Sequence, residues 1–485
     1  MQAVHAIHAG TQAARWIWSL AGAAVLAIVL GGCAVQPFRP FTKLKHPGTA
    51  CAAPETAEPT RTTPEVDATY TLHFVEFDDQ GWTFGDDAPE AGTPSRQIDC
   101  AIRDLRDKLV GDPRDNLAKK SVLSFVYVHG WNHSADNDDR DVRKFRKLLS
   151  SRAALFPDRH IVGIYVAWQG NTLDVWGVRN LTFWGRKNAA HHVAEGRVRE
   201  LFARIKGLRE HWNGRGDFAD RDCDWEPRGT DRCPLRTIMI GHSFGGLILY
   251  NSAAPYLIET LSQHRDLPDG ERRPRSARAK GIADLIVLLN PAFEGSRYEA
   301  VFQASRSYRA ESSEPPLLIT LTSTADWATK KAFPVARWIN SIFQYPASSE
   351  EQSNAMRNTH GHIKAYLTHT LCMADQACEA GLERIDAVVD GQSIASSRRF
   401  CGGMILRAHR PEEDWRSIVW NVRTDGRIIP NHNDIDRDEV LRFIAQIYSD
   451  VTGLNTDACD PEFFASRELE MAPPAAGPGP TAQVP

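Results

Sequence analysis

Residues 237–245 of this 485-residue chain read TIMIGHSFG, and this stretch decides the fold. The apolar TIMI run is typical of a buried strand, and residues 246–250, GLILY, are typical of the start of a buried helix. A sharp turn from strand to helix needs small residues such as Gly241 and Gly245, because a Cβ there would collide with a neighbouring element. The turn also holds the residue at its tip in a strained conformation with an exposed side chain. We therefore expect the Ser243 hydroxyl at the edge of a sheet, where a histidine can reach it.

Strand and helix patterns alternate over most of the chain. Strands are predicted at 70–77, 122–128, 160–168, 235–240, 285–289, 317–322 and 417–422, and helices at 96–109, 138–154, 187–211 and 436–449. This alternation indicates an α/β protein with a mostly parallel central sheet and helices on both faces. Residues 345–400 are weakly patterned and rich in polar side chains, and we interpret them as an insertion or cap.

The G-x-S-x-G motif at 241–245, between a strand and a helix, resembles the nucleophile elbow of the α/β-hydrolase fold serine hydrolases. The resemblance covers about residues 67–455 and implies the α/β-hydrolase fold. It also implies the chain order nucleophile, acid, histidine, with each residue on a loop at the carboxyl end of a strand. Catalysis would pass through an acyl intermediate on Ser243 and would need neither a metal nor an organic cofactor. The alternative interpretation is a glycine-rich turn that holds an ordinary serine.

A carboxylate that could orient the histidine follows two of the predicted strands. Asp326 lies just after the strand at 317–322, where the resembled family usually has its acid, and we predict it in that role. Glu294, after the strand at 285–289, is the alternative. A simpler interpretation of Asp326 is a carboxylate that caps a helix or a turn, because aspartate is favoured there anyway.

The predicted general base is His432, which follows the last predicted strand and precedes the last predicted helix. The resemblance calls for a histidine in this position. By contrast, His360, His362 and His369 precede the last strand and would need an unusual path to the serine.

Two backbone N–H groups must face the oxygen that becomes negative during acyl transfer. The first is predicted to come from Phe244, the residue after the nucleophile. The second should come from the loop after the strand at 122–128, where HGWN at 129–132 resembles the His-Gly loop of the family and Trp131 is the candidate donor. We interpret His129 as a structural residue that supports this loop through hydrogen bonds.

Large apolar side chains gather in two further segments. They could line an apolar acyl pocket, although packing in the cap and core is the more common role of such clusters. The two groups are Trp168, Trp176, Phe183 and Trp184, and Phe333, Trp338, Ile342 and Phe343.

The N-terminus carries an apolar run at 16–32, which ends in the sequence LGGC. A short apolar run before small residues and a cysteine resembles a bacterial lipoprotein signal peptide, which implies cleavage before Cys33 and lipid attachment to its sulfur. A single membrane helix is the alternative, although the run is slightly short for the ~20 residues that a span needs. We expect a lipoprotein anchored in the bacterial cell envelope, facing the periplasm or the outer membrane. The expected organisation is a signal peptide at 1–32, a disordered tether at 33–66, an α/β-hydrolase domain at 67–460 and a disordered tail at 461–485.

The nine cysteines agree with an exported protein. Eight remain besides Cys33, and an even number in such a protein suggests disulfide bonds. The pairs that we predict, from their proximity in sequence, are Cys223 with Cys233 and Cys372 with Cys378. Several free buried thiols are the alternative.

The sequence therefore predicts an exported, membrane-anchored serine hydrolase, an esterase-like or lipase-like enzyme that acts on a small-molecule or lipid ester. Acyl transfer and amide hydrolysis use the same three residues, and the sequence does not separate these reactions. A non-catalytic envelope lipoprotein is a further alternative, which would predict a broken triad. The net charge of −4 gives no indication of a nucleic-acid partner.

Overall fold

The computed structural model describes residues 65–66, 70–83, 94–111, 121–170, 183–214, 233–262, 281–308, 315–340, 347–375, 378, 387–389, 392–394, 396–452 and 459. The predicted signal peptide, the predicted lipid attachment site at Cys33 and the predicted tail lie outside these ranges. None of the helices within the described ranges is long and apolar enough to cross a membrane.

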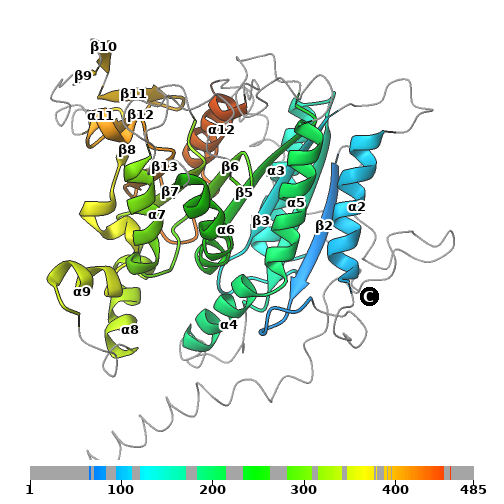
Figure 1. Cartoon of the computed structure of the whole chain (residues 1–485), viewed down its shortest axis with the longest axis horizontal. Helices are drawn as coiled ribbons and strands as arrows, with labels where there is room; N and C mark the ends of the chain where they lie inside the picture. Colours follow the sequence, from blue (N-terminus) through cyan, green and yellow to red (C-terminus); the bar gives the residue numbers. More distant parts are fainter. Residues whose placement is uncertain are drawn as a thin grey trace, which may run out of the picture.

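The centre of the protein is an 11-stranded sheet of order β1-β2-β4-β3-β5-β6-β7-β13-β8-β12-β11 (Figure 1). The strands from β2 to β8 in this order are parallel, whereas β1, β12 and β11 pair antiparallel at the two ends. The strands of this sheet are β1 (Glu65–Val66), β2 (Tyr70–Phe77), β3 (Val122–Val128), β4 (His160–Trp168), β5 (Leu235–His242), β6 (Leu285–Leu289), β7 (Leu318–Ser323), β8 (His369–Met373), β11 (Ser397–Phe400), β12 (Met404–Ala408) and β13 (Val419–Thr424). A separate hairpin joins β9 (Ala387–Val389) to β10 (Gln392–Ile394). The predicted α/β class with a mostly parallel sheet is confirmed.

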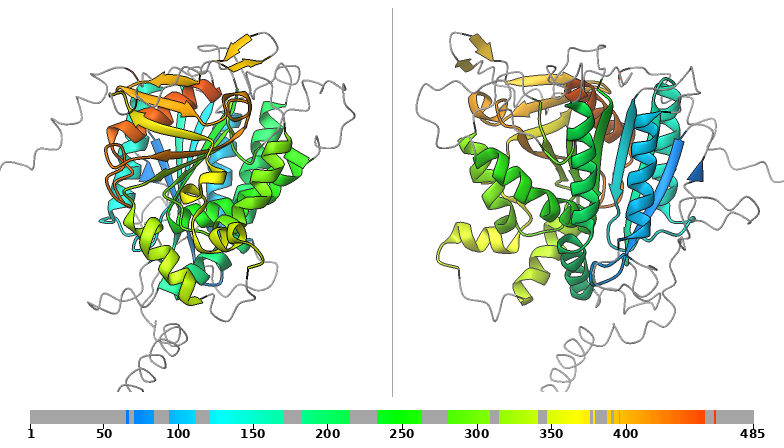
Figure 2. Two further views of the ribbon diagram at one scale, coloured as in Figure 1. Left: turned by 90° about the vertical axis from the view of Figure 1, so that its left-hand side faces the viewer. Right: turned by 45° about the vertical axis from the view of Figure 1, so that its right-hand side comes forward.

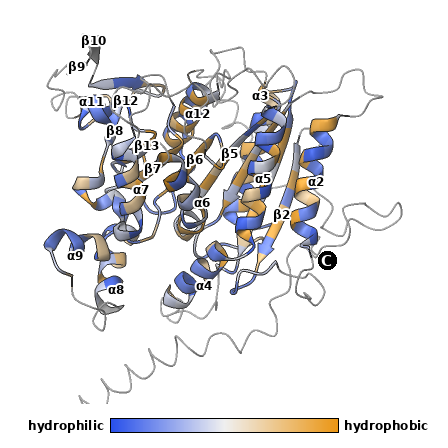
Figure 3. Ribbon diagram, in the orientation of Figure 1, coloured by the Kyte–Doolittle hydropathy of each residue, from blue (hydrophilic) through white to orange (hydrophobic). Residues whose placement is uncertain are grey.

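Helices cover both faces of the sheet (Figure 2). The helices are α2 (Arg96–Val110), α3 (Arg140–Leu155), α4 (Phe183–Glu195), α5 (Val198–Asn213), α6 (Phe244–Ser262), α7 (Gly295–Ser307), α8 (Phe333–Asn340), α9 (Glu350–Arg357), α11 (Pro411–Asp414) and α12 (Asp438–Thr452). One hydrophobic cluster joins the sheet to α2, α4, α5, α6 and α7, and a second joins its other face to α3 and α12. The helices α2 and α5 carry both hydrophobic and hydrophilic residues, as expected for helices that cover one face of a sheet (Figure 3).

Side chains of β3 alternate between the two hydrophobic clusters. Val126 and Val128 belong to the first cluster, whereas Phe125 and Tyr127 belong to the second. Both faces of this strand are therefore buried, as is typical of a parallel sheet between two helix layers. The carboxyl ends of the parallel strands lie at one edge of the sheet, and α4, α8 and α9 lie beyond this edge (Figure 1).

Two parts of the chain differ from the sequence-based expectation. The helix predicted at 187–211 is divided into α4 and α5, which are separated at Gly196. An added Cβ on Gly196 would lie 2.5 Å from the carbonyl oxygen of Gly81, so the chain approaches another loop closely where the helix is interrupted. Residues 345–400, predicted as an insertion or cap, also contribute β8, which lies in the main sheet between β13 and β12.

Disulfide bonds are present in the described part of the chain. The predicted pair Cys372–Cys378 is confirmed, with Cα atoms 6.1 Å apart. A second bond joins Cys401 to Cys459. Because Cys223 lies outside the described residues, its pairing with Cys233 stays a prediction, although Cys233 is disulfide-bonded.

Candidate active site

Ser243 occupies a sharp turn between β5 and α6. Strand β5 ends at His242 and helix α6 begins at Phe244, so a single residue connects them. The φ angle of Ser243 is 54°, in the left-handed region that residues with a side chain rarely adopt. An added Cβ on Gly245 would lie 2.0 Å from the carbonyl oxygen of Val128, which explains the glycine after the serine. The turn therefore has the strained backbone and the close approach predicted from the motif, but Ser243 is only 4% exposed, so the prediction of an exposed side chain was wrong.

The structure brings the three predicted residues together in one hydrogen-bonded chain. The Nε2 atom of His432 lies 2.7 Å from the Oγ atom of Ser243. The Nδ1 atom of His432 lies 2.8 Å from the Oδ2 atom of Asp326. An ionised carboxylate only accepts hydrogen bonds, so Nδ1 carries the proton and Nε2 is free to accept one from the serine.

Loops at the same edge of the sheet supply all three residues. Ser243 follows β5, Asp326 follows β7 and His432 follows β13, and β7 and β13 are neighbours in the sheet. Their order along the chain is Ser243, Asp326 and His432. Strands that are distant in sequence therefore place these residues within hydrogen-bond distance.

Asp326 is completely buried and makes several hydrogen bonds. Besides His432, it accepts hydrogen bonds from the backbone N–H of Ala328 at 2.9 Å and from the hydroxyl of Thr329 at 2.5 Å. Burial alone would raise the pKa of Asp326, but the bond and charge of His432 and the bonds from Thr329 outweigh it and lower the pKa. The same carboxylate thus caps the following helical turn and orients the histidine, so the two interpretations of Asp326 are compatible.

Two side chains that were not predicted as site residues hold the backbone carbonyl of His432. The Nε2 atom of His242 lies 2.9 Å from this oxygen, and the Nδ2 atom of Asn290 lies 3.1 Å from it. Asn290 also accepts a hydrogen bond from the backbone N–H of Ser323, and its own φ angle is 42°. Burial, with the neighbouring His432, lowers the pKa of His242 to about 3, so its ring is neutral and donates through Nε2. These contacts connect the carboxyl ends of β5, β6 and β7 to the loop that holds His432.

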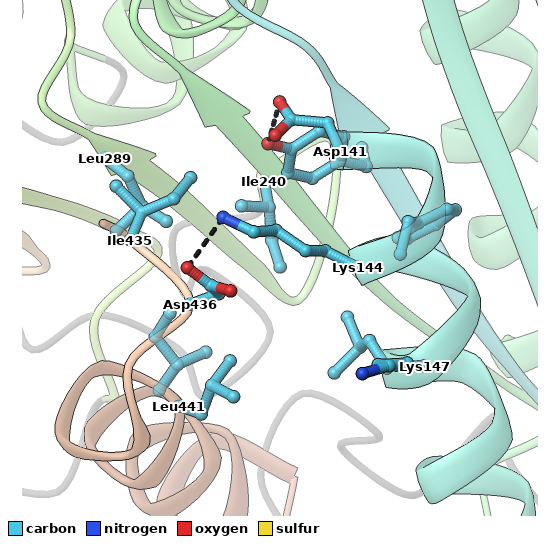
Figure 4. Close-up of a pocket in the computed structure, with 12 residues that line it drawn as sticks. Asp141, Lys144, Lys147, Ile240, Leu289, Ile435, Asp436 and Leu441 are labelled. Atoms are coloured by element: carbon cyan, nitrogen blue, oxygen red, sulfur yellow. Dashed lines mark hydrogen bonds and ion pairs between the residues drawn. The ribbon is translucent and has the colours of Figure 1, made fainter. Parts of the chain in front are cut away.

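Helix α3 anchors the segment that follows His432. The guanidinium of Arg140 lies 3.2 Å from Asp434, and the ammonium of Lys144 lies 2.6 Å from Asp436. Figure 4 shows the second ion pair beside a cavity of about 120 Å³. The cavity is lined by Tyr127, Asp141, Lys144, Phe145, Lys147, Leu148, Ile240, Leu289, Ile435, Asp436, Leu441 and Ile444, and therefore does not include the serine or its partners.

The loop after β3 lies directly against the serine. An added Cβ on Gly130 would lie 3.0 Å from the Cβ of Ser243, so only glycine allows this approach. The backbone N–H groups of Trp131 and Phe244 donate to no other residue of the described ranges. The N–H of Phe244 also belongs to the first turn of α6, where the helix dipole favours negative charge. Both groups are therefore free to bind an oxyanion.

His129 supports this loop as expected. Its Nδ1 atom lies 2.8 Å from the carbonyl oxygen of Gly130, and its Nε2 atom accepts a hydrogen bond from the backbone N–H of Trp168. Burial lowers the pKa of His129 to about 4, so the ring is neutral. Both ring nitrogens are used in these contacts, and neither points to Ser243.

The alternative residues make other contacts. Glu294 forms ion pairs with three cationic side chains and does not contact His432 within the described residues. His360 is fully buried, with Nε2 3.0 Å from the hydroxyl of Thr320. His369 contacts the adjacent Thr368. His362 comes nearest to the site, because its Nε2 atom lies 3.0 Å from the hydroxyl of Thr329, which binds Asp326.

An aromatic wall borders the turn that holds the serine. The ring of Phe183 lies 5.2 Å from that of Phe244, 5.5 Å from that of Trp131 and 6.4 Å from that of Phe333 (centroid distances). The wall is defined here by these four residues. Of the predicted pocket residues, Trp168 also contacts Phe244, whereas Trp176, Ile342 and Phe343 lie outside the described ranges.

One group of side chains has the composition of a metal site. His133, Asp139 and Asp141 place one candidate ligand atom each within 4.8 Å of one another. However, His133 already binds Asp139 at 2.9 Å, and the carboxylate of Asp139 caps helix α3 through the N–H of Asp141. Tyr127 donates to Asp141 as well. These hydrogen bonds account for the close approach of His133, Asp139 and Asp141 to one another.

Comparison with known proteins identifies no family for this chain. No model of a known protein family matches the chain, and neither a curated protein nor a solved structure matches it. The fold class and the geometry of the site are therefore the features that bear on function.

Proposed function

We propose that this protein is a serine hydrolase of the α/β-hydrolase fold that cleaves carboxylic esters. The observation that carries the proposal is the hydrogen-bonded chain from Ser243 through His432 to Asp326. A serine hydroxyl is a weak nucleophile unless a base takes its proton, and a third group must orient that base. The left-handed conformation of Ser243 and the adjacent free N–H groups supply the remaining parts of such a site.

The first half of the proposed reaction acylates the serine. The Oγ atom of Ser243 attacks the ester carbonyl as its proton passes to Nε2 of His432, and Asp326 stabilises the imidazolium. The backbone N–H groups of Phe244 and Trp131 bind the negative oxygen of the tetrahedral intermediate. When that intermediate collapses, the alcohol leaves with the proton from Nε2.

The second half returns the serine. His432 takes a proton from a water molecule, and the resulting nucleophile attacks the acyl carbon. The bond to Oγ then breaks, and Ser243 regains its proton from Nε2. The products are a carboxylic acid and an alcohol, and no metal or organic cofactor takes part in these steps.

The aromatic wall supports an ester with an apolar segment as the substrate. The Phe244 ring is buried, whereas the rings of Trp131 and Phe183 are half-buried, so an apolar group next to the reacting carbonyl would contact these two rings. Small-molecule and lipid esters both have such a segment. Burial of apolar surface against these rings would supply binding free energy at about 25 cal/mol per Å².

We further propose that lipid on Cys33 anchors the protein to the bacterial cell envelope. The support is the short apolar run that ends in LGGC. Incorporation of labelled palmitate into the wild-type protein, and its absence from the Cys33→Ser variant, is the expected result. Palmitate incorporation that persists in the variant would contradict the anchor.

Ester hydrolysis by matched variants tests the proposed activity. We expect the purified protein to hydrolyse p-nitrophenyl butyrate, and Ser243→Ala to lower kcat on the order of 10⁴- to 10⁶-fold. Ser151→Ala on α3, the same change at a serine outside the site, should leave kcat unchanged. A Ser243→Ala variant that retains kcat within tenfold of the wild type would refute the proposal.

A further inference from the structure

Three cationic side chains meet around one carboxylate beyond the carboxyl edge of the sheet. Lys187 of α4 binds Glu294 directly, and the Nε atom of Arg337 of α8 lies 3.0 Å from the same carboxylate oxygen. The Nε atom of Arg297 of α7 lies 3.2 Å from the other oxygen of Glu294. We call these four residues the cationic cluster.

Positive charge exceeds negative charge in this cluster. Within the described residues, Glu294 is the carboxylate with which all three cations pair. The exposed fractions of the Lys187 and Arg337 side chains are 5% and 10%, so water compensates little of their charge. Only Arg297, at 43%, is well solvated. One carboxylate does not balance three cations, and buried charge that is not balanced is costly, so the cluster favours the uptake of an anion.

A neighbouring histidine responds to the same positive charge. Burial lowers the pKa of His191 to about 4, and Arg297 and then Lys187 lower it further than Glu294 raises it. With this lowered pKa, the His191 ring is neutral near pH 7. Its Nδ1 atom lies 3.2 Å from the amide nitrogen of Asn251. It adds a neutral polar group to the cluster and does not supply a counter-charge.

The cationic cluster adjoins the aromatic wall of the proposed active site. The ammonium of Lys187 lies 4.9 Å from the centroid of the Phe333 ring, and the Phe333 ring contacts that of Phe183. Phe183 in turn contacts Phe244, the residue next to the serine. Phe244 and Phe333 are themselves buried in the core. The partly exposed rings of Trp131, Phe183 and Trp184 contact one another in turn, and the ammonium of Lys187 lies 5.5 Å from the centroid of the Trp184 ring. Partly exposed aromatic rings therefore lie between the loop beside Ser243 and the cationic cluster.

We infer that the cationic cluster is an anion-binding subsite, and that the substrate is an ester whose far end carries a carboxylate. This inference rests on the proposed ester hydrolysis at Ser243. The carbonyl of the ester lies at the serine, its apolar segment follows the aromatic wall, and its carboxylate binds Lys187 and Arg337. Arginine and lysine form charge-assisted hydrogen bonds with carboxylates, which are about twice as strong as neutral ones.

Calorimetric binding to the Ser243→Ala protein tests the subsite without turnover. The probes are the monomethyl esters of α,ω-dicarboxylic acids of increasing chain length, each compared with the corresponding dimethyl ester. We expect one range of chain lengths in which the monoester, which carries the free carboxylate, binds about tenfold tighter or more. Equal affinity of monoester and dimethyl ester at every length would overturn the inference.

Two substitutions in the cluster, each added to Ser243→Ala, should change this preference in opposite directions. Arg337→Gln removes a cation and should reduce the preference for the monoester about tenfold, whereas Glu294→Gln removes the carboxylate and should increase it. General damage to the fold would not strengthen binding. If Glu294→Gln does not fold, Arg337→Gln decides, because it relieves the excess positive charge. Lys206→Gln on α5 removes one cation elsewhere and should leave the preference unchanged.

The two proposals fail in different ways. If the Ser243→Ala protein prefers the monoesters but the wild-type protein hydrolyses no ester, the subsite stands and the hydrolase proposal fails. If the wild-type protein hydrolyses esters but the Ser243→Ala protein shows no preference for the monoesters, the hydrolase proposal stands and the subsite is refuted. An unchanged preference in Arg337→Gln would also refute the subsite.

Discussion

Replacing Asp326 by asparagine separates its two roles. Its Oδ1 atom accepts hydrogen bonds from the N–H groups of Ala328 and Thr329, and an asparagine oxygen can continue to accept them. The new amide NH₂ then replaces Oδ2, which faces Nδ1 of His432 at 2.8 Å. Because two donors cannot pair, the imidazole must move its proton to Nε2, where it can no longer accept the proton of Ser243. The opposite orientation of the asparagine amide is unfavourable, because its NH₂ group would then face the backbone N–H groups of Ala328 and Thr329.

The structure sets the size of the expected effect. The charge-assisted bond from His432 to Asp326 contributes about 1.5–3 kcal/mol. The buried carboxylate also stabilises the imidazolium, by about 4 kcal/mol at an effective dielectric constant of about 20. Loss of both effects corresponds to a decrease in kcat of about 10⁴- to 10⁵-fold, since each 1.36 kcal/mol is tenfold. The melting temperature should change little because the helical cap is retained.

Steady-state hydrolysis of p-nitrophenyl butyrate and thermal unfolding measure the two consequences. The control is Asp107→Asn, the same chemical change on the exposed surface of α2, which should alter neither value. A kcat of Asp326→Asn within tenfold of the wild type would refute the reasoning. Loss of turnover in Glu294→Gln, with activity retained in Asp326→Asn, would show that the alternative acid is the correct one.

Three further predictions concern other parts of the fold and the site. Asn290→Asp removes a hydrogen-bond donor to the backbone carbonyl of His432 and should lower kcat about 10- to 100-fold with little change in KM. An unchanged kcat would show that this contact does not position the histidine. Gly245→Ala places a Cβ 2.0 Å from a backbone oxygen of β3 and should lower the free energy of unfolding in urea by more than about 3 kcal/mol. Gly207→Ala, in open space on α5, should raise it by about 0.5–1 kcal/mol. Similar effects of the two substitutions would contradict the close approach at Gly245. Burial lowers the pKa of Lys187 to about 8, so its charge is present below this pH and is lost above it. The ratio of kcat/KM for the monoester to that for the dimethyl ester should therefore fall as the pH rises through about 8, and a constant ratio would contradict the role of Lys187.

Much of the sheet could be predicted because its strands are buried on both faces. A strand such as LIVLL has no polar side chain that could face water, and its predicted bounds coincide with β6, Leu285–Leu289. Strand β8, in contrast, begins with His369 and Thr370 and lies in a segment of polar residues. Its place in the sheet depends on pairing with β13 and β12, which the local pattern does not contain.

The candidate site was predictable where a residue has a fixed place in the chain order. Ser243 is marked by its glycines, and Asp326 and His432 follow strands in the order that the resemblance requires. His242 and Asn290 carry no such mark, because each acts through a hydrogen bond to a carbonyl oxygen that is more than a hundred residues away in sequence. A polar residue directly after an entirely apolar strand, such as Asn290 after β6, is the signal that could have indicated one of them.

A fluorophosphonate probe tests directly whether Ser243 is an activated nucleophile, as we propose. The probe forms a covalent bond with an activated serine, and mass spectrometry of the digested protein locates the adduct. We expect one adduct on the peptide that contains Ser243, absent from Ser243→Ala and strongly reduced in His432→Ala. An adduct on another residue, or no adduct on the folded wild-type protein, would contradict it.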